Sequence, residues 1–286
     1  MSTRIAVPSK GRLRESVINL LSHSGYNLSA FGRSNASAVT EDIEFIEMRP
    51  RDAAAWLAAG RLDAAFVSTD TALENHIEDW PSTPLGFSRS DLILACRNDS
   101  PYQTAADLAG KTVATHLPAW TARWFAGQNI DVDVVAMGGS LEGICARGMA
   151  DAIVDLRETG ASLARNSLRV VVEAKACQAE FVTAPEEKLS AESVAALADL
   201  SLRIDAAQAA QRTQYLMLHI PADKVDELGG VFPGLEAPTL LPLAGRQDIV
   251  AAHMVVQRNE LWTRLSELRA LGATGIVALP TDAIVE

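Results

Sequence analysis

Short apolar runs alternate with segments of helical periodicity along the first two thirds of the chain. The apolar runs predict strands at residues 4–7, 43–48, 63–67, 92–96, 111–115, 132–135, 152–154 and 176–183. Helical spacing predicts helices at residues 13–22, 52–59, 121–126 and 191–210, and another from Leu141. Strand, helix and strand in this order form βαβ units, which pack as parallel sheets covered by helices. Two such series predict two α/β lobes, divided near residues 91 and 177.

The C-terminal part of the chain follows a different order. It predicts strands at residues 215–220, 239–243, 249–256 and 275–279, with helices at residues 222–231 and 259–271. The order βαββαβ is that of the split βαβ, or ferredoxin-like, arrangement. The resulting layout has a first lobe of residues 1–91 and 177–211, a second lobe of residues 92–176, and a small third domain of residues 212–286.

Composition changes this picture in one respect, the kind of partner the protein can have. The 286 residues include 25 Lys plus Arg against 36 Asp plus Glu, a net charge of −11. Such a chain is unsuited to non-specific binding of nucleic acid or of an anionic membrane surface. Any anionic ligand must therefore be captured by groups gathered at one place.

Several common classes of site lose support. Cys96, Cys145 and Cys177 form no CxxC pair, and the five histidines show no paired spacing, so neither a disulfide framework nor a zinc site is indicated. Walker A, G-x-G-x-x-G and G-x-S-x-G patterns are absent from the sequence. With no signal-peptide pattern and no apolar run of about 20 residues, we expect a cytoplasmic protein.

The strongest local pattern is ADAIVDLRETGASL at residues 150–163. A short strand leads into a turn with Thr159, Gly160 and Ser162, and a helix is predicted to begin near Leu163. Glycine lets the backbone approach a ligand, hydroxyls donate, and helix amides favour an anion such as phosphate. Carboxylates beside the turn suit ribose hydroxyls or Mg²⁺. The alternative, equally weighted from this segment alone, is a serine that caps a helix and a solvated loop carboxylate.

Further polar residues follow other predicted strands. Lys10 and Arg12 come after the first strand, Arg49 and Arg51 after the second, and Asp70 after the third. Because ligands of open α/β sheets bind outside the carboxyl ends of the strands, we expect these groups at one rim. Alternatively, the cations are solvated loop charges and Asp70 caps a helix.

Two more features fall in loops of this kind. The turn at residues 137–140, which ends in Ser140, offers backbone amides to an anion, although this pattern is weak by itself. His116 falls in a candidate site loop, where a polar contact is plausible.

Together these segments resemble the ATP phosphoribosyltransferase family of histidine biosynthesis, in its long, allosteric form. The matching stretches are residues 10–13, 49–52, 138–140 with Glu142, 150–163, 233–243 and 271–280. The resemblance implies a two-lobed fold like that of periplasmic binding proteins, followed by a ferredoxin-like regulatory domain that binds histidine as inhibitor. It also implies Mg²⁺, a cytoplasmic location, and homo-oligomers from dimer to hexamer.

The reaction implied by the resemblance joins N1 of ATP to the ribose of phosphoribosyl diphosphate and releases pyrophosphate. By that resemblance Lys10, Arg12 and Arg51 face substrate phosphates and form the catalytic set. The substrate-binding set comprises Asp70, Ser140, Asp151, Asp155, Glu158, Thr159, Gly160, Ala161 and Ser162. The effector set comprises Leu235, Ala237 and Thr239. No metal ligand is assigned directly.

The chain departs from the family pattern at four positions. Ser68 and Gly138 stand where the family has Gly and Asn, Asp91 replaces an arginine, and Leu117 replaces a tyrosine. These positions belong mainly to the acceptor side or to the hinge, whereas the phosphoribosyl cradle is intact. Two alternatives therefore stay open, a divergent paralogue that uses another base as acceptor and a non-catalytic ligand-binding or regulatory subunit.

Overall fold

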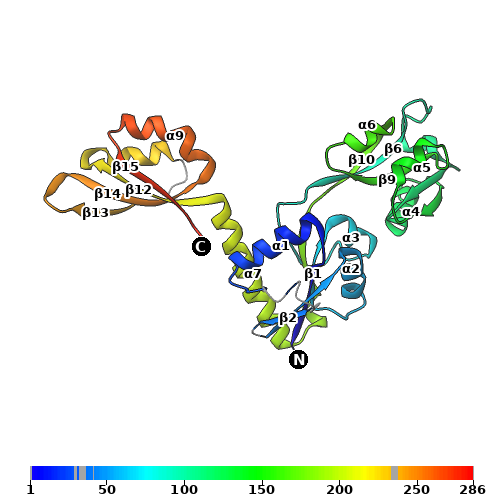
Figure 1. The fold of residues 1–286 in the computed structure, drawn as a ribbon, viewed down its shortest axis with the longest axis horizontal. Coiled ribbons are helices and arrows are strands. Elements are labelled where there is room, and N and C mark those ends of the chain that lie inside the picture. The colour runs from blue at the N-terminus through cyan, green and yellow to red at the C-terminus, as the bar shows by residue number, and fades with distance from the viewer. Residues whose placement is uncertain (1, 29–30, 32–36, 41, 233–237, 286) are drawn as a thin grey trace. The chain divides into compact units, whose positions relative to one another are not determined.

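The computed structural model describes residues 2–28, 31, 37–40, 42–232 and 238–285. Contacts divide the chain into two compact units, one of residues 1–19 and 27–198 and the other of residues 20–26 and 199–286. Among the described residues the first unit holds two sheets and the second unit holds one (Figure 1). Each unit is described by itself.

The first sheet of the first unit has the strand order β2-β3-β1-β4-β11-β5. Its strands are β1 (Thr3–Pro8), β2 (Ser37–Thr40), β3 (Ile43–Met48), β4 (Ala64–Ser68), β5 (Ser82–Pro84) and β11 (Ala179–Thr183). The associated helices are α1 (Gly11–His23), α2 (Pro50–Ala58) and α3 (Thr69–Glu74). β1 pairs in parallel with β3 and β4, and its apolar run is fully buried, as expected for a strand covered on both faces.

The second sheet has the order β10-β6-β9-β7-β8. Its strands are β6 (Ser90–Arg97), β7 (Thr112–Thr115), β8 (Asp133–Ala136), β9 (Ala152–Arg157) and β10 (Leu168–Cys177). The associated helices are α4 (Pro118–Ala126), α5 (Leu141–Ala146) and α6 (Ala161–Arg165), with 3₁₀ turns η1 (Ala105–Leu108) and η2 (Glu186–Lys188) in the unit. β7 pairs in parallel with β8 and β9, whereas β6 is antiparallel to β9 and β10.

The chain crosses between these two sheets twice, once before β6 and once between β10 and β11. The crossings are hydrogen-bonded to each other, because Leu85 N donates to Ala179 O at 2.9 Å and Ala179 N donates to Phe87 O at 3.0 Å. Gly86 and Ser88 have φ angles of +75° and +52°. The left-handed conformation at both positions gives the first crossing its turn.

The second unit contains a four-stranded antiparallel sheet of order β13-β14-β12-β15. Its strands are β12 (Thr213–Pro221), β13 (Thr239–Leu243), β14 (Arg246–Gln257) and β15 (Thr274–Pro280). α8 (Leu228–Val231), α9 (Arg258–Ala270) and the 3₁₀ turn η3 (Ala222–Glu227) complete it, and α7 (Ala191–Arg212) leads into it. Leu216, Leu218 and Met254 form its core with Leu261 and Leu268 of α9, which lies along one face (Figure 1).

The predicted fold class, two α/β lobes and a βαββαβ domain, is confirmed by these sheets. Three details are wrong. The strand expected at residues 176–183 is two strands, β10 and β11, because the chain passes from one sheet to the other at Gln178. Both lobe sheets are mixed rather than parallel, because β2 and β11 run antiparallel to their neighbours β3 and β4, and β6 runs antiparallel to β9 and β10. The helix expected at residues 222–231 is η3 followed by a single turn of α-helix.

None of the helices within the described ranges is long and apolar enough to cross a membrane. This agrees with the absence of a long apolar run in the sequence.

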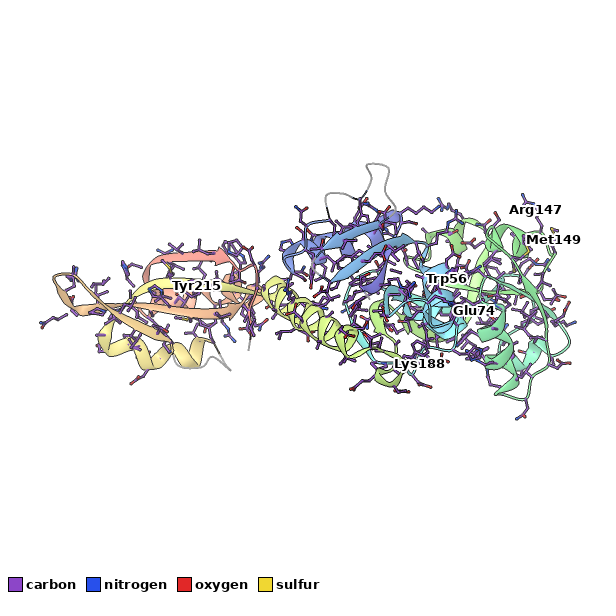
Figure 2. The ribbon with its side chains drawn as sticks, turned by 90° about the horizontal axis from the view of Figure 1, so that it is seen from below. Trp56, Glu74, Arg147, Met149, Lys188 and Tyr215 are labelled. Atoms are coloured by element: carbon purple, nitrogen blue, oxygen red, sulfur yellow. The ribbon has the colours of Figure 1, made fainter. Side chains whose placement is uncertain are left out.

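Helices of the two lobes meet where α3 contacts α4. The carboxylate of Glu74, labelled in Figure 2, accepts hydrogen bonds from Ala119 N at 3.1 Å and Trp120 N at 2.9 Å. These amides lie in the first turn of α4, which has no cap from its own N-cap residue, Leu117. In return, Arg123 of α4 donates to Leu73 O at 2.5 Å. Glu74 therefore serves as the missing cap of α4 and joins the lobes.

Replacing this cap tests the contact. We expect Glu74→Ala to lower the free energy of unfolding by about 1 kcal/mol, the usual effect of removing a helix cap. The thermal unfolding midpoint should fall accordingly, whereas Asp79→Ala, at an exposed carboxylate nearby, should leave it unchanged. Equal midpoints for both variants would show that Glu74 does not stabilise α4.

Candidate functional site

A pocket of about 500 Å³ lies where the carboxyl ends of strands from both lobe sheets meet. Its lining comes from the start of α1, from the β4–α3 junction, from the first crossing, and from the end of β9. Lys10, Arg12, Asp70 and Glu158, all predicted site residues, line it. The structure thus brings these four residues to one pocket, and their binding of substrate stays a prediction.

The turn that follows β9 faces a second hollow of about 300 Å³. Thr159, Gly160, Ala161 and Ser162 all line it. Gly160 has a φ of +75°, which an L side chain adopts only with strain. α6 begins at Ala161, earlier than expected, and has only five residues, so its dipole is weak. A ligand at this turn therefore meets hydroxyl groups and an accessible backbone rather than the N-terminus of a long helix.

Three links hold this turn in place. Ala161 N donates to Thr159 Oγ1 at 3.5 Å, and Ser162 Oγ donates to a carboxylate oxygen of Glu142 at 2.7 Å. The bond from Ser162 connects α6 to α5. Arg12 of α1 pairs with Glu158, so the turn is also connected to the other lobe.

Asp155 lies within β9, four residues before Thr159, and its side chain is 19% exposed. Burial raises the pKa of this carboxyl, and the nearby carboxylates of Glu142 and Asp70 act in the same direction. The amide of Leu156 and the ring of His116 oppose the shift without cancelling it. Asp155 therefore has an energetic reason to accept a cation, a proton or a hydroxyl donor.

His116 lies between two carboxylates. Its Nδ1 is 3.4 Å from Asp155 Oδ1, and its Nε2 is 3.9 Å from Asp70 Oδ2. Arg51 of α2 donates to the backbone oxygen of His116. The predicted residues Asp70, Asp155 and Arg51 are thus brought together around a histidine for which the sequence indicated only a polar contact.

The cations of the site differ in how firmly they are held. Arg12 is 77% exposed despite its pairing with Glu158, so it has room to turn toward an anion. Gly11, with a φ of +78°, begins α1 between Lys10 and Arg12. Arg51 is also exposed, and its bond to the His116 loop joins the two lobes.

Two predicted residues do not reach this group. Asp151 precedes β9 at the opposite end of the strand from Glu158, and its carboxylate accepts from Tyr102 Oη at 2.7 Å and from Thr112 N at 3.0 Å. Burial alone raises the pKa of Asp151, but these hydrogen bonds outweigh it, so the pKa lies below its ordinary value. Ser140 precedes α5 with a φ of +58° and lines none of the hollows described above.

Only one of the three expected effector-binding residues lies among the residues that the structure describes. Leu235 and Ala237 lie outside the described residues. Thr239 begins β13 as an exposed residue of this outer strand of the sheet.

Sequence reasoning missed two arginines. Arg89 lines the 500 Å³ pocket from the first crossing, and Arg157 lines the 300 Å³ hollow. Arg157 pairs with Asp91 of the neighbouring strand β6 and with Glu173 of β10, the next strand in the sheet, each at 2.6 Å. The one available signal was the position of Arg89 beside the predicted lobe boundary. Strand pairing, which brings Asp91 opposite Arg157, cannot be derived from either segment alone.

A divalent cation would find only part of its ligands in this arrangement and would take the others from a substrate. Within the described ranges there is no preformed group of three or more His, Cys, Asp or Glu for a metal. Mg²⁺ is commonly held by one or two carboxylates together with substrate phosphates. Burial and the acidic neighbours raise the pKa of Asp155, and a bound cation would lower it by favouring the charged carboxylate.

Comparisons with known proteins show which family the chain belongs to. Residues 49–205 match the family model "ATP phosphoribosyltransferase", and residues 210–283 match "HisG, C-terminal domain". ATP phosphoribosyltransferases of Methanococcoides burtonii and Parabacteroides distasonis are 32% and 33% identical, with 99% of each chain covered in both cases.

A solved structure extends the comparison to the fold. The ATP phosphoribosyl transferase (HisG:HisZ) complex from Thermotoga maritima matches 71% of this chain and 98% of that chain, at 26% identity and a TM-score of 0.59. The resemblance predicted from the sequence is thereby confirmed. The chain belongs to the ATP phosphoribosyltransferase family, in the form that carries the additional C-terminal domain.

Proposed function

We propose that this protein joins ATP to phosphoribosyl diphosphate, giving N1-phosphoribosyl-ATP and pyrophosphate, the first step of histidine biosynthesis. The observation that carries the proposal is the pocket at the lobe junction, where an anion-binding turn, exposed cations and a buried carboxylate meet. Membership of the family supports the same reaction.

The donor would occupy the turn after β9. Thr159, Gly160, Ala161 and Ser162 suit its 5-phosphate, because the turn offers hydroxyls and a glycine whose backbone has no side chain in the way. Asp155 suits the ribose hydroxyls, since a buried carboxylate gains by accepting hydrogen bonds. Donor binding is thus assigned to a single strand and turn.

The reaction breaks the bond between the ribose C1 and pyrophosphate and forms a bond from C1 to N1 of adenine. Pyrophosphate leaves with the electron pair, so negative charge grows on its oxygen. Lys10, Arg12 and Arg51 would stabilise this charge, and the pocket would hold N1 in line with C1. No protein nucleophile is needed.

Mg²⁺ would be held by Glu158 and Asp155 together with the pyrophosphate group. When bound, it supplies positive charge to the leaving oxygens. Arg12 would then be released from Glu158 to the phosphates. The acceptor base would lie toward Asp70, which also lines the pocket.

We further propose three functional domains: residues 1–91 with 177–211, residues 92–176, and residues 212–286. The separate sheets support this division, although contacts group residues 199–211 of α7 with the C-terminal unit. The last domain would bind histidine as inhibitor at Leu235, Ala237 and Thr239. The chain would act in the cytoplasm as a homo-oligomer from dimer to hexamer.

The reaction itself gives the first test. With ATP, phosphoribosyl diphosphate and Mg²⁺, the full chain should release pyrophosphate and form a product of the mass of phosphoribosyl-ATP. Gly160→Val should raise the donor KM at least about 10-fold, because the left-handed turn would be distorted. Thr159→Ala should also raise the KM of phosphoribosyl diphosphate, because the hydroxyl that would donate a hydrogen bond to its phosphate is lost.

Gly110→Val is the matched control, since Gly110 has a φ of +70° in an exposed turn outside the pockets described. It should lower stability as Gly160→Val does while leaving KM unchanged. Turnover with another purine but not with ATP would point to a paralogue, and no turnover with any base to a binding subunit.

Asp151, just before β9, and Asp155, within it, should behave oppositely when each is replaced by asparagine. The raised pKa of Asp155 means that its charge lowers stability at neutral pH, so Asp155→Asn should raise the unfolding midpoint while greatly raising donor KM. Asp151→Asn should lower the midpoint and leave donor KM unchanged, because it loses bonds from Tyr102 and Thr112.

The difference between wild type and Asp151→Asn should be complete above about pH 4 and should shrink as the pH falls through the lowered pKa of Asp151. Thermal midpoints at several pH values measure this. A raised KM for phosphoribosyl diphosphate in Asp151→Asn would contradict this prediction, because it would show that Asp151 contributes to donor binding.

Inhibition tests the regulatory domain. Histidine should inhibit the full chain, and Thr239→Arg should raise the inhibitory concentration at least about 10-fold by filling space at the start of β13. Thr263→Arg, at an exposed position of α9, is the control and should leave inhibition unchanged. Wild-type sensitivity in Thr239→Arg would contradict the assignment.

A further inference from the structure

Arg157 ends β9, immediately before the turn that would bind the donor, and the mechanism above gives it no role. Its Nη2 donates to Asp91 Oδ2 and to Glu173 Oε1, each at 2.6 Å. Both bonds join charged groups, so they are shorter and stronger than bonds between neutral groups. One nitrogen of the guanidinium is thus held by carboxylates of two other strands, β6 and β10.

These three residues form a row across one face of the sheet. Asp91 lies directly opposite Arg157 in the register of β6 and β9, and Glu173 lies opposite Ile93, two residues along β6 from Asp91. Side chains two residues apart on a strand point to the same face. Ile93 shares a buried cluster with Leu163 of α6. The row therefore lies on the face against which α6 packs.

The stem of Arg157 lies against the turn itself. A Cβ atom placed on Gly160 would be 3.8 Å from Cδ of Arg157, an ordinary van der Waals distance. Arg157 lines the 300 Å³ hollow together with Thr159 and Gly160, and all three also line another hollow of about 390 Å³. Arginine commonly packs its apolar stem while its charged head is bonded elsewhere. The stem thus lies beside the glycine of the turn, and its far end is bonded to the sheet.

The same contacts argue against a direct bond from Arg157 to a substrate phosphate. The side chain of Arg157 is 24% exposed, whereas that of Arg12 is 77% exposed. Arg12 pairs with one carboxylate, and Arg157 pairs with two. Turning its guanidinium toward a phosphate would break both bonds and leave two like charges on neighbouring strands, which is unfavourable. A guanidinium held in this way is suited to fixing the turn rather than to capturing a ligand.

The turn needs such support because its internal links are weak. The bond from Ala161 N to Thr159 Oγ1 is 3.5 Å long, and Gly160 brings the conformational freedom of a residue without a side chain. A ligand that must order a loop loses affinity by the free energy of that ordering. A turn that is already fixed by its neighbour therefore binds a phosphate more tightly.

We propose that Arg157 is a positioning residue of the donor site. It holds the turn after β9 in its binding conformation through the stem beside Gly160 and through the bonds to Asp91 and Glu173. The inference rests on the proposed function in one respect, that phosphoribosyl diphosphate is the ligand of the turn. Arg157 touches no reacting atom, so its loss affects binding of the donor and not binding of the acceptor.

Calorimetric titration of the full chain with phosphoribosyl diphosphate and Mg²⁺ tests the proposal without requiring turnover. Arg157→Ala should raise the Kd of the donor at least about 10-fold and leave the KM of ATP unchanged. Arg157→Lys should stay within about 3-fold of wild type, because its ammonium can donate to both carboxylates from a similar stem. Arg97→Ala, which removes the ion pair to Asp99 at the other end of β6, is the control and should bind the donor as wild type does.

A charge exchange separates positioning from a purely structural ion pair. Asp91→Arg combined with Arg157→Asp keeps opposite charges on β6 and β9 but removes the stem from beside Gly160. This double variant should have an unfolding midpoint closer to wild type than Arg157→Ala has, while its donor Kd stays raised. It also gives the same reading of donor binding if Arg157→Ala fails to fold.

Three results would overturn the proposal. A wild-type donor Kd in Arg157→Ala or in the exchange variant would show that the stem does not position the turn. A Kd raised as much in Arg157→Lys as in Arg157→Ala would show that the guanidinium itself contacts the donor. If wild type binds the donor but forms no product, the proposed function fails, and the Kd values still decide this inference. A wild type that binds no donor would overturn both.

Discussion

The two hydrogen-bonded crossings between the lobe sheets are the constraint on which the site depends. Because Leu85, Phe87 and Ala179 tie the crossings to each other, strands of both sheets deliver their carboxyl ends to one pocket. Each lobe contributes what the other lacks. The first brings Lys10, Arg12 and Asp70, and the second brings the turn after β9. The capping of α4 by Glu74 and the contact of Arg51 with the His116 loop add further links between the lobes.

Electrostatics follow from that geometry. A chain with a net charge of −11 must bind two highly anionic substrates, so its cations have to act locally. Arg12 is paired with Glu158 yet exposed, an arrangement that keeps a cation at the rim without fixing it. The buried carboxylates around His116 have the opposite role. They make the interior of the site a place where positive charge, whether on a metal ion or on a proton, is favoured.

Much of this was accessible from the sequence where the signal is local. The turn after β9 was predicted because strand, glycine turn and helix follow one another within 14 residues. Residues 168–175 of β10 were missed because Arg169, Glu173 and Lys175 interrupt the apolar pattern of this outer strand of the sheet. Asp151 was expected in the substrate-binding set together with Asp155, yet four residues along a strand separate them by about 13 Å. Arg89, Arg157 and the partners of His116 depend on which strands meet, and no single segment specifies that.

The account makes the turn after β9, together with the start of α1, the place where the donor is bound. Hydrogen exchange of the full chain with and without phosphoribosyl diphosphate and Mg²⁺ measures this directly, because bound amides are protected. The account predicts protection at residues 155–163 and 10–13, with the four-stranded sheet of the C-terminal unit unaffected. Protection confined to other segments, or none at saturating donor, would contradict it.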